Sequence, residues 1–322
     1  MAKQDITRAA NLVAEHHDST VILYNGPINM DGFGQLLEAL QVSETRPPRS
    51  HVLFILSTPG GLANPAYQIA RTLQRGFKRF DLYVPAYCKS AGTLIALGAN
   101  RIIMDDLSEL GPLDVQLVQK DEIGRRRSGL ILKNALEGLS QATLEAFERV
   151  MLGIKAGSGG VVSFETASRI AASIASEVMT PVYAQINPEA LGNDLRDLNV
   201  ATEYGVRLLG HSQNASHDCV HRLVHGYPSH DFIIDREEAA QLFRMVDSPD
   251  EKILDLTMQL GNMVYGASRE PYVVRLDELE GNGNDLDDHT SADEGTDQIG
   301  DLDEGREDQG TGDTEDRGAA GS

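Results

Sequence analysis

Two turns that follow short apolar runs constrain this chain more than any other feature. The run at residues 52–56 ends in the turn TPGGL at 58–62, and the run at residues 82–87 ends in the serine-bearing turn KSAG at 89–92. Each turn leads into a segment whose apolar residues recur at helical spacing. The pattern therefore predicts two strand–turn–helix units whose turns contribute to one site.

Ser90 stands in the second turn, directly before the helical segment 91–97. Its hydroxyl is then expected at a helix N-terminus, where unpaired backbone N–H groups and the helix dipole favour developing negative charge. That location suits the nucleophile of an acyl-transfer reaction. Serine is also among the best helix N-caps, so a serine–glycine turn taken alone is read as a cap.

Gly60 and Gly61 change that interpretation. Glycines in a turn let backbone N–H groups point into a site without an obstructing side chain, although a Pro-Gly pair also turns a chain with no further role. Together, the two turns can bring one N–H of this glycine pair and the N–H of Ala91 onto a single carbonyl oxygen. Such an oxyanion hole stabilises the charge that develops during acyl transfer.

The paired motifs resemble a known superfamily. TPGGL at 58–62 together with KSAGTLIALGA at 89–99 is similar to the Clp-protease and signal-peptide-peptidase superfamily, which has a crotonase-like fold. Within it, the chain most resembles the serine dehydrogenase proteinase family, because YPSH at 227–230 followed by FIID at 232–235 also matches. The resemblance covers roughly residues 20–245.

The resemblance implies an α/β fold, a Clp/crotonase-like spiral of strand–strand–helix units with helical C-terminal additions. It also implies a serine endopeptidase in which Ser90 is the nucleophile and the N–H groups of Gly61 and Ala91 hold the oxyanion, with the choice between the two adjacent glycines left open. Ser229 and His230 match the late motif, and the resemblance implies that they line the substrate channel or bind a neighbouring subunit.

A serine hydroxyl needs a base to take its proton. Clp proteases use a histidine downstream of the serine, but this chain has Asp114 near that place. Signal-peptide-peptidase relatives use a lysine whose pKa is lowered by burial. Lys133, at the start of an apolar helical stretch, is the predicted base, and Lys120, among acidic neighbours, stays open as the alternative. Lys89 is expected to project away from a site that Ser90 faces.

No metal and no cofactor are expected. His217 and His221 are spaced i, i+4, which suits a metal if their segment is helical. The H-E-x-x-H motif of zinc proteases is not matched, because Asp218 stands where that motif has its glutamate.

The remaining pattern predicts an α/β order of elements. Strands are expected at 21–24, 52–56, 82–87 and 101–104, helices at 32–40, 66–77, 91–97, 136–154, 166–179, 188–191 and 237–246, and a flexible glycine joint at 157–160.

Composition sets the wider bounds. Hydrophobic residues make up 41% of the 322 positions, but there is no Trp and aromatics are only 5%, so aliphatic packing must fill the core. Two cysteines, Cys88 and Cys219, are too few for a secreted disulfide framework and fit a reducing cytoplasm. There is no signal-peptide pattern and no apolar run of about 18 residues, which predicts a cytoplasmic location. Peripheral attachment to a membrane through a partner stays open.

Charge is concentrated at the C-terminus. The net charge is −21, and residues 276–322 hold 17 acidic residues against two arginines, with no aromatic residue. This segment is expected to be a disordered acidic tail, and it argues against a nucleic-acid partner. The rest is divided into an N-terminal helical extension at 1–20, a Clp/crotonase-like peptidase domain at 21–248 and a C-terminal helical extension at 249–275.

The leading prediction is a metal-independent serine peptidase acting on a peptide or protein substrate. A homo-oligomer is implied by the resemblance alone, and a membrane-protein or chaperone partner stays open. One alternative is a catalytically inert scaffold that binds an extended peptide in the pocket of Gly60, Gly61 and Ser90. A less favoured alternative is an acyl-thioester enzyme of the crotonase fold, which leaves Ser90 without a task.

Overall fold

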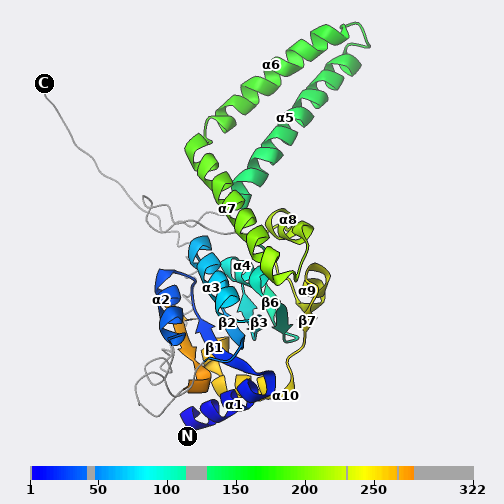
Figure 1. Cartoon of the computed structure of the whole chain (residues 1–322). Coiled ribbons are helices and arrows are strands. Elements are labelled where there is room, and N and C mark those ends of the chain that lie inside the picture. The colour runs from blue at the N-terminus through cyan, green and yellow to red at the C-terminus, as the bar shows by residue number, and fades with distance from the viewer. Residues whose placement is uncertain (1, 42–47, 114–128, 230, 267, 279–322) are drawn as a thin grey trace, which may run out of the picture.

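The computed structural model describes residues 2–41, 48–113, 129–229, 231–266 and 268–278 (Figure 1). The strands are β1 (Ser19–Asn25), β2 (His51–Ser57), β3 (Arg79–Val84), β4 (Tyr87–Cys88), β5 (Arg101–Met104), β6 (Glu109–Leu110), β7 (Val246–Asp247) and β8 (Tyr272–Arg275). The helices are α1 (Ala2–His17), α2 (Met30–Ala39), α3 (Ala63–Gly76), α4 (Ala91–Gly98), α5 (Gly129–Gly157), α6 (Phe164–Tyr183), α7 (Pro188–Ser212), α8 (His217–His225), α9 (Arg236–Leu242), α10 (Glu251–Leu260), α11 (Asn262–Tyr265) and the 3-10 turn η1 (Leu276–Glu278).

Six strands form the main sheet, in the order β7-β5-β3-β2-β1-β8. All neighbours are parallel except β8, which runs antiparallel to β1. Parallel neighbours need crossover connections, and α2, α3 and α4 supply them between successive strands. The apolar runs at 21–24, 52–56 and 101–104 fall within β1, β2 and β5, so the α/β fold class is confirmed.

The run expected as one strand at 82–87 is divided into two strands. β3 ends at Val84, and β4 leaves the main sheet to pair in parallel with β6. Thus β3 is followed by β4 and then α4, while β5 is followed by β6. This order is the predicted strand–strand–helix spiral, and it places the short β4–β6 sheet directly before the Ser90 turn.

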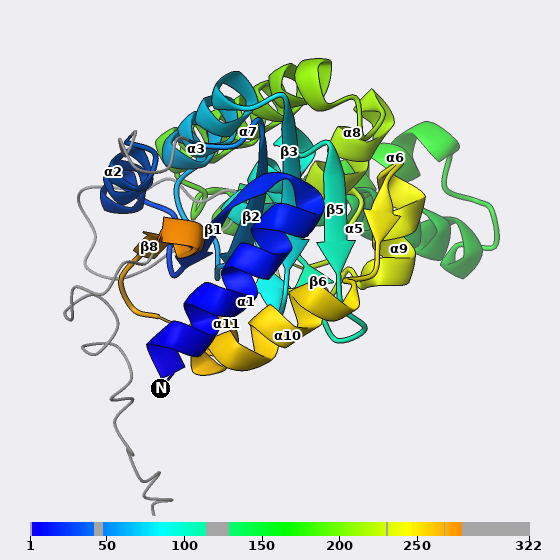
Figure 2. The ribbon, with the colours of Figure 1, turned by 60° about the horizontal axis from the view of Figure 1, so that its bottom comes forward.

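Both faces of the main sheet are buried, which explains why its strands read as continuous apolar runs. In β1, Ile22 and Tyr24 belong to a core shared with α2, α3, α4 and α7, whereas Val21 and Leu23 belong to a second core under α1 and α10. Figure 2 shows α1 and α10 lying across this second face. None of the helices in the described part of the chain has the length and apolarity needed to cross a bilayer.

The C-terminal segment is more closely joined to the core than the sequence indicated. α10 and α11 are helical as expected within 249–275, but residues 272–275 form β8 at the edge of the main sheet. Short β-branched stretches such as this gain their strand structure from the neighbouring strand rather than from local preference.

The expected start of the acidic tail at residue 276 is also different. Leu276 and Asp277 are buried, and Asp277 Oδ1 accepts the N–H of Val21 at 3.2 Å and lies 3.2 Å from Arg275 Nε. These contacts satisfy a buried carboxylate, so η1 belongs to the core. Residues 279–322 lie outside the described residues.

Two helical expectations also need correction. The helix expected at 188–191 is the first turn of α7, which continues to Ser212. The helix expected at 237–246 ends at Leu242, because residues 246–247 form β7 and pair with β5.

α5 and α6 form a long antiparallel hairpin that projects from the body (Figure 1). The glycine joint expected at 157–160 is the turn between them, where Gly159 and Gly160 have φ values of 57° and 85°. Lys155 Nζ donates to the carbonyl oxygen of Val162 at 2.8 Å and closes this turn.

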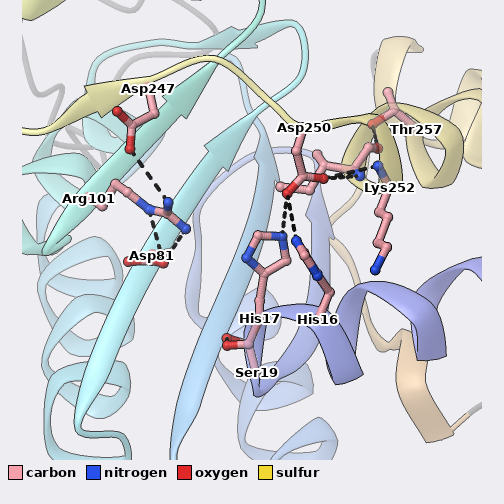
Figure 3. A network of polar contacts seen from close by, with 10 residues as sticks. His16, His17, Ser19, Asp81, Arg101, Asp247, Asp250, Lys252 and Thr257 are labelled. Atoms are coloured by element: carbon pink, nitrogen blue, oxygen red, sulfur yellow. Dashed lines mark hydrogen bonds and ion pairs between the residues drawn. The ribbon is translucent and has the colours of Figure 1, made fainter.

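Polar contacts join the end of α1 to the start of α10 (Figure 3). Asp250 Oδ2 lies 2.8 Å from His17 Nε2 and 3.9 Å from His16 Nε2. Its Oδ1 caps α10 by accepting the N–H groups of Lys252 and Ile253, both at 3.0 Å. Burial lowers the pKa of His17, and this effect outweighs the opposing effect of the Asp250 carboxylate.

We predict that the free energy of unfolding decreases as the pH falls through the ordinary histidine range near 6.5. The pKa of His17 is lower in the folded than in the unfolded protein, so the unfolded chain binds the proton more readily and acid favours unfolding. The charged groups around His17 are His16, Asp250 and Arg101. In His17→Gln, denaturant titrations at a series of pH values should give a shallower slope of unfolding free energy against pH.

The matched control is His211→Gln, on an exposed part of α7, which is expected to keep the wild-type slope. An unchanged slope in His17→Gln would contradict the assignment of this pH dependence to His17.

Candidate active site

Ser90 lies where β4 ends and α4 begins, and its backbone is strained. Its φ and ψ are 49° and −110°, a combination that costs a non-glycine residue on the order of 1–3 kcal/mol. The Ser90 side chain makes no capping hydrogen bond to α4, so the cap interpretation does not describe it. The residue is only 3% exposed. Enzymes of the α/β-hydrolase fold place their serine nucleophile at a similarly sharp strand-to-helix turn.

The first turn, at 58–62, is fixed against the Ser90 segment by backbone hydrogen bonds. The N–H of Thr58 donates to the carbonyl oxygen of Tyr87 at 2.9 Å, and the N–H of Lys89 donates to the carbonyl oxygen of Thr58 at 3.0 Å. These two bonds form a parallel bridge between Thr58 and Cys88. The two turns predicted from the sequence therefore lie side by side.

A second pair of backbone bonds holds the same turn from its other side. The N–H of Ile28 donates to the carbonyl oxygen of Gly60 at 2.9 Å, and the N–H of Leu62 donates to the carbonyl oxygen of Ile28 at 2.8 Å. Gly60 and Gly61 have φ values of 106° and 151°, which side chains disfavour. Because the turn is held from both sides, its backbone N–H groups keep a fixed direction.

Close approach also requires glycine at both positions. A Cβ atom on Gly60 would lie 2.8 Å from Ser90 Cβ, and one on Gly61 would overlap the backbone of Ile28. The backbone of the first turn is therefore in contact with Ser90, with no space for a side chain between them.

Two backbone donors remain at this contact. The Gly60 N–H is used, because it donates to Thr58 Oγ1 at 3.1 Å. No hydrogen bond among the described residues uses the N–H of Gly61 or of Ala91. Ala91 is the first residue of α4, where an N–H has no acceptor inside the helix. The arrangement favours Gly61 over Gly60 as the donor and fits the predicted oxyanion hole.

α4 approaches the two turns closely because its first residues are small. A Cβ atom on Gly92 would lie 2.5 Å from Thr58 Cγ2 and 2.6 Å from Cys88 Sγ. Burial raises the pKa of the Cys88 thiol strongly, so this sulfur stays protonated and is no alternative nucleophile. Thr93 Oγ1 donates to the carbonyl oxygen of Gly111 at 2.7 Å. Because Gly111 directly follows β6, this bond joins α4 to the end of β6.

The lysine candidates are placed differently. Lys89 Nζ lies 3.0 Å from Glu109 Oε1, so its side chain extends along the β4–β6 sheet, whereas the Ser90 side chain packs at the Gly60 turn. Lys133 lies in α5, but its side chain is outside the described part of the structure, as is all of Lys120. The base therefore stays a prediction.

The late motif lies beside the small sheet. Leu110 of β6 and Ile234 exchange two backbone hydrogen bonds, of 2.8 and 3.0 Å. β6 pairs with β4, which leads into Ser90, so the segment 232–235 is one strand away from the Ser90 turn. Ser229 is exposed, and His230 lies outside the described residues, so their roles stay predictions. The sequence contained the motif but no periodicity that would have located it.

Metal-binding side chains gather elsewhere. Among the described residues, neither His217 nor His221 belongs to a group of three such side chains close enough to share an ion. One such group consists of His16, His17 and Asp250, whose ligand atoms lie within 4.8 Å of one another. It joins α1 to α10 on the face of the main sheet opposite α4 (Figures 2 and 3), and is separate from the Ser90 turn.

Comparison with known families agrees with this geometry. The sequence pattern of the ClpP-like SDH-type serine proteinases matches residues 22–124, a segment that includes both turns and Ser90. The resemblance to this family that the sequence motifs predicted is confirmed over this segment. The match extends across β1 to β6 and α2 to α4 and ends before Lys133.

Individual relatives give less information about activity. Two uncharacterized proteins of Methanocaldococcus jannaschii are similar: one is 37% identical over 108 residues, covering 32% of this chain and 37% of its own, and the other is 32% identical over 117 residues, covering 35% and 39%. The chain thus spans well under half the length of these relatives.

Two solved structures of a membrane-bound stomatin-specific protease, one with a substrate peptide, also align. Their sequence identities are 16% and 17% and their TM-scores are 0.41 and 0.42. The alignments cover 74% and 80% of this chain, and 82% and 85% of the length of the solved chains.

We predict that Gly92→Ala lowers the free energy of unfolding by about 1–3 kcal/mol, because the added methyl group overpacks the contact with Thr58 and Cys88. Gly153→Ala in α5 is the matched control, since a Cβ there meets nothing within 4 Å and alanine stabilises an open helical position by about 0.5–1 kcal/mol. Equilibrium denaturation measures both. A Gly92→Ala protein as stable as Gly153→Ala would contradict the close packing at this junction.

Proposed function

We propose that this chain is a serine endopeptidase in which Ser90 attacks the carbonyl carbon of a peptide bond. The observation that supports this most is the contact of the strained Ser90 with the glycine turn at 58–62, where no acceptor among the described residues takes the N–H groups of Gly61 and Ala91. An N-terminal helix end and two fixed donors suit a negatively charged intermediate. The family match over residues 22–124 supports the same class of chemistry.

The proposed sequence of steps needs one base and no metal. A neutral Lys133 takes the proton of the Ser90 hydroxyl as its oxygen bonds to the carbonyl carbon. The resulting oxyanion accepts hydrogen bonds from Gly61 and Ala91, and the C–N bond then breaks as Lys133 passes the proton to the leaving amine. Water, deprotonated by the same lysine, hydrolyses the ester on Ser90 and restores the enzyme.

Burial of the site makes these interactions stronger. Ser90 is almost fully enclosed, and charges interact more strongly where water is excluded. The same enclosure favours an extended peptide over a bulky folded protein as the group that reaches Ser90. The proposed substrate is therefore an unfolded or exposed segment of a protein, and a membrane-protein or chaperone partner is one way to present it.

The two cysteines support the proposed cytoplasmic location. Both Cys88 and Cys219 are free and buried, as expected for a reducing compartment.

A catalytically inert scaffold is the second candidate, and the observation that favours it is the ion pair of Lys89 with Glu109, which takes the lysine next to Ser90 out of use as a base. In that case the Gly60–Ser90 contact would bind a peptide without cleaving it.

We predict that the protein hydrolyses a labelled unfolded protein such as casein in the presence of EDTA, and that Ser90→Ala loses at least about 10³-fold in rate, because no other group replaces the nucleophile. The matched control is Ser108→Ala, a buried serine after β5 that lies outside the Ser90 turn. Equal hydrolysis by wild type and Ser90→Ala would overturn the mechanism. Peptide binding without hydrolysis by the wild type would favour the scaffold.

We predict that Lys133→Ala reduces the rate by at least about 10²-fold while substrate binding is retained, since the loss is in proton transfer. Lys252→Ala, on α10 at the far face of the sheet, is the matched control and should keep full activity. Loss of activity in Lys120→Ala with full activity in Lys133→Ala would contradict the assignment of the base while leaving Ser90 as nucleophile.

A further inference from the structure

Three side chains that can bind a metal meet where the end of α1 lies beside the start of α10. His16 and His17 are the last residues of α1, and Asp250 is the N-cap of α10. Figure 3 shows both imidazole rings directed at the Asp250 carboxylate. The proposed chemistry at Ser90 uses none of the three, because α1 and α10 cover the face of the main sheet opposite α4.

The two oxygens of the Asp250 carboxylate have different surroundings. Oδ1 accepts the N–H groups of Lys252 and Ile253, both at 3.0 Å, and these two bonds fix the orientation of the carboxylate. Oδ2 faces the histidines, at 2.8 Å from His17 Nε2 and 3.9 Å from His16 Nε2. Carboxylates that bind metals are commonly oriented by hydrogen bonds of their own.

The two histidines converge although they are adjacent in the sequence. Successive residues of a helix point about 100° apart, so neighbouring side chains do not normally face each other. Here the helix ends, because Asp18 has a φ of 48° and Ser19 Oγ donates to the carbonyl oxygen of His17 at 3.0 Å. The two rings are inclined at 84°, with centroids 4.9 Å apart, and each presents its Nε2 to Asp250 Oδ2.

The spacing of the three atoms suits a divalent ion between them. Zn²⁺ binds nitrogen and carboxylate oxygen at about 2.0–2.2 Å in tetrahedral geometry, which separates two of its ligands by roughly 3.3–3.6 Å. The separations of 2.8 and 3.9 Å from Asp250 Oδ2 lie on either side of that range. No two of the three ligand atoms are more than 4.8 Å apart, so small side-chain rotations bring all of them to an ion.

The orientation of His17 also favours a shared cation. Among the described residues, its buried Nε2 has no hydrogen-bond partner of good geometry, although Asp250 Oδ2 lies only 2.8 Å away. A direct hydrogen bond needs the N–H to point along the line to the oxygen. In a tetrahedral site each lone pair points at the ion instead, to one side of the line that joins two ligand atoms.

The surrounding charges allow a cation to bind here. Arg101 is the cationic side chain that lowers the pKa of His17, after the larger effect of burial, and it is itself paired with Asp81 at 2.8 Å and with Asp247 at 3.5 Å. The side chain of His16 is 50% exposed, so an ion can reach the site from solvent. A chain of net charge −21 attracts cations.

We propose that His16, His17 and Asp250 bind one Zn²⁺ ion that holds α1 against α10. Two imidazole nitrogens and one carboxylate oxygen are ligands typical of zinc, and three protein ligands leave the fourth position to water. The ion joins the first helix of the chain to its C-terminal segment across the second core (Figure 2). The proposal does not depend on the peptidase chemistry, and hydrolysis in the presence of EDTA stays the expectation for Ser90.

The test is calorimetric titration of zinc chloride into the full chain, after treatment with EDTA and removal of the EDTA by dialysis. Excess Mg²⁺ is present throughout, because it occupies carboxylate-only sites and competes poorly for imidazole. The wild type is expected to bind about one Zn²⁺ per chain. His16→Gln and Asp250→Asn should each weaken binding at least about tenfold. Asparagine is an equally good N-cap, so Asp250→Asn removes the charged ligand and keeps the cap of α10.

The matched control is His217→Gln/His221→Gln, which removes two histidines spaced i, i+4 on α8 and should bind Zn²⁺ like the wild type. Circular dichroism establishes that each variant is folded. Hydrogen exchange supplies a second readout: Zn²⁺ should slow amide exchange in α1 and α10 of the wild type, but not in His16→Gln.

Three results would overturn the proposal. The first is a wild type that binds no Zn²⁺ in excess Mg²⁺. The second is Zn²⁺ binding of equal affinity in the wild type, His16→Gln and Asp250→Asn, including binding that only His217→Gln/His221→Gln abolishes. The third is Zn²⁺ binding that leaves amide exchange in α1 and α10 unchanged.

Discussion

The rest of the site depends on one constraint, the backbone clamp between the turn at 58–62 and the segment at 87–89. Two N–H···O bonds join these segments, and a second pair fixes the same turn to Ile28. The clamp leaves no room for a Cβ atom at three glycines: it would meet the Ser90 side chain at Gly60, the backbone of Ile28 at Gly61, and the side chains of Thr58 and Cys88 at Gly92. It also holds Ser90 at a φ of 49°. Strain of this kind persists only where the surrounding structure determines the backbone.

The clamp in turn depends on the parallel sheet beneath it. β1, β2 and β3 are parallel and buried on both faces; β2 leads into the turn at 58–62, and β3 leads through β4 into the Ser90 turn. α1 and α10 cover one face and α2, α3 and α4 the other. Aliphatic side chains fill most of both sides of the sheet, and Tyr24, Phe54, Phe80 and Tyr83 are the largest side chains buried there. This packing holds the strands at a fixed spacing, and so it holds the two turns that follow them.

Much of this arrangement could be predicted from the residues. β1, β2 and β5 were predicted by apolar runs, and the two turns by Gly60, Gly61 and Ser90. The division of residues 82–87 into β3 and β4 could not, because a run of apolar residues does not show where a strand leaves its sheet. β8 was missed for a related reason: its pairing with β1 is set by tertiary contact and not by local preference.

The candidate site shows the same division. The sequence predicted that Ser90 lies beside the glycine turn, but it left open whether Gly60 or Gly61 is the oxyanion donor. The structure favours Gly61, because the Gly60 N–H donates to Thr58 Oγ1.

A direct test of Ser90 as the nucleophile is reaction of the folded protein with a fluorophosphonate followed by peptide mapping. A single adduct on Ser90, lost when the protein is unfolded first, is the predicted result. Modification of another serine with Ser90 unmodified would contradict the account.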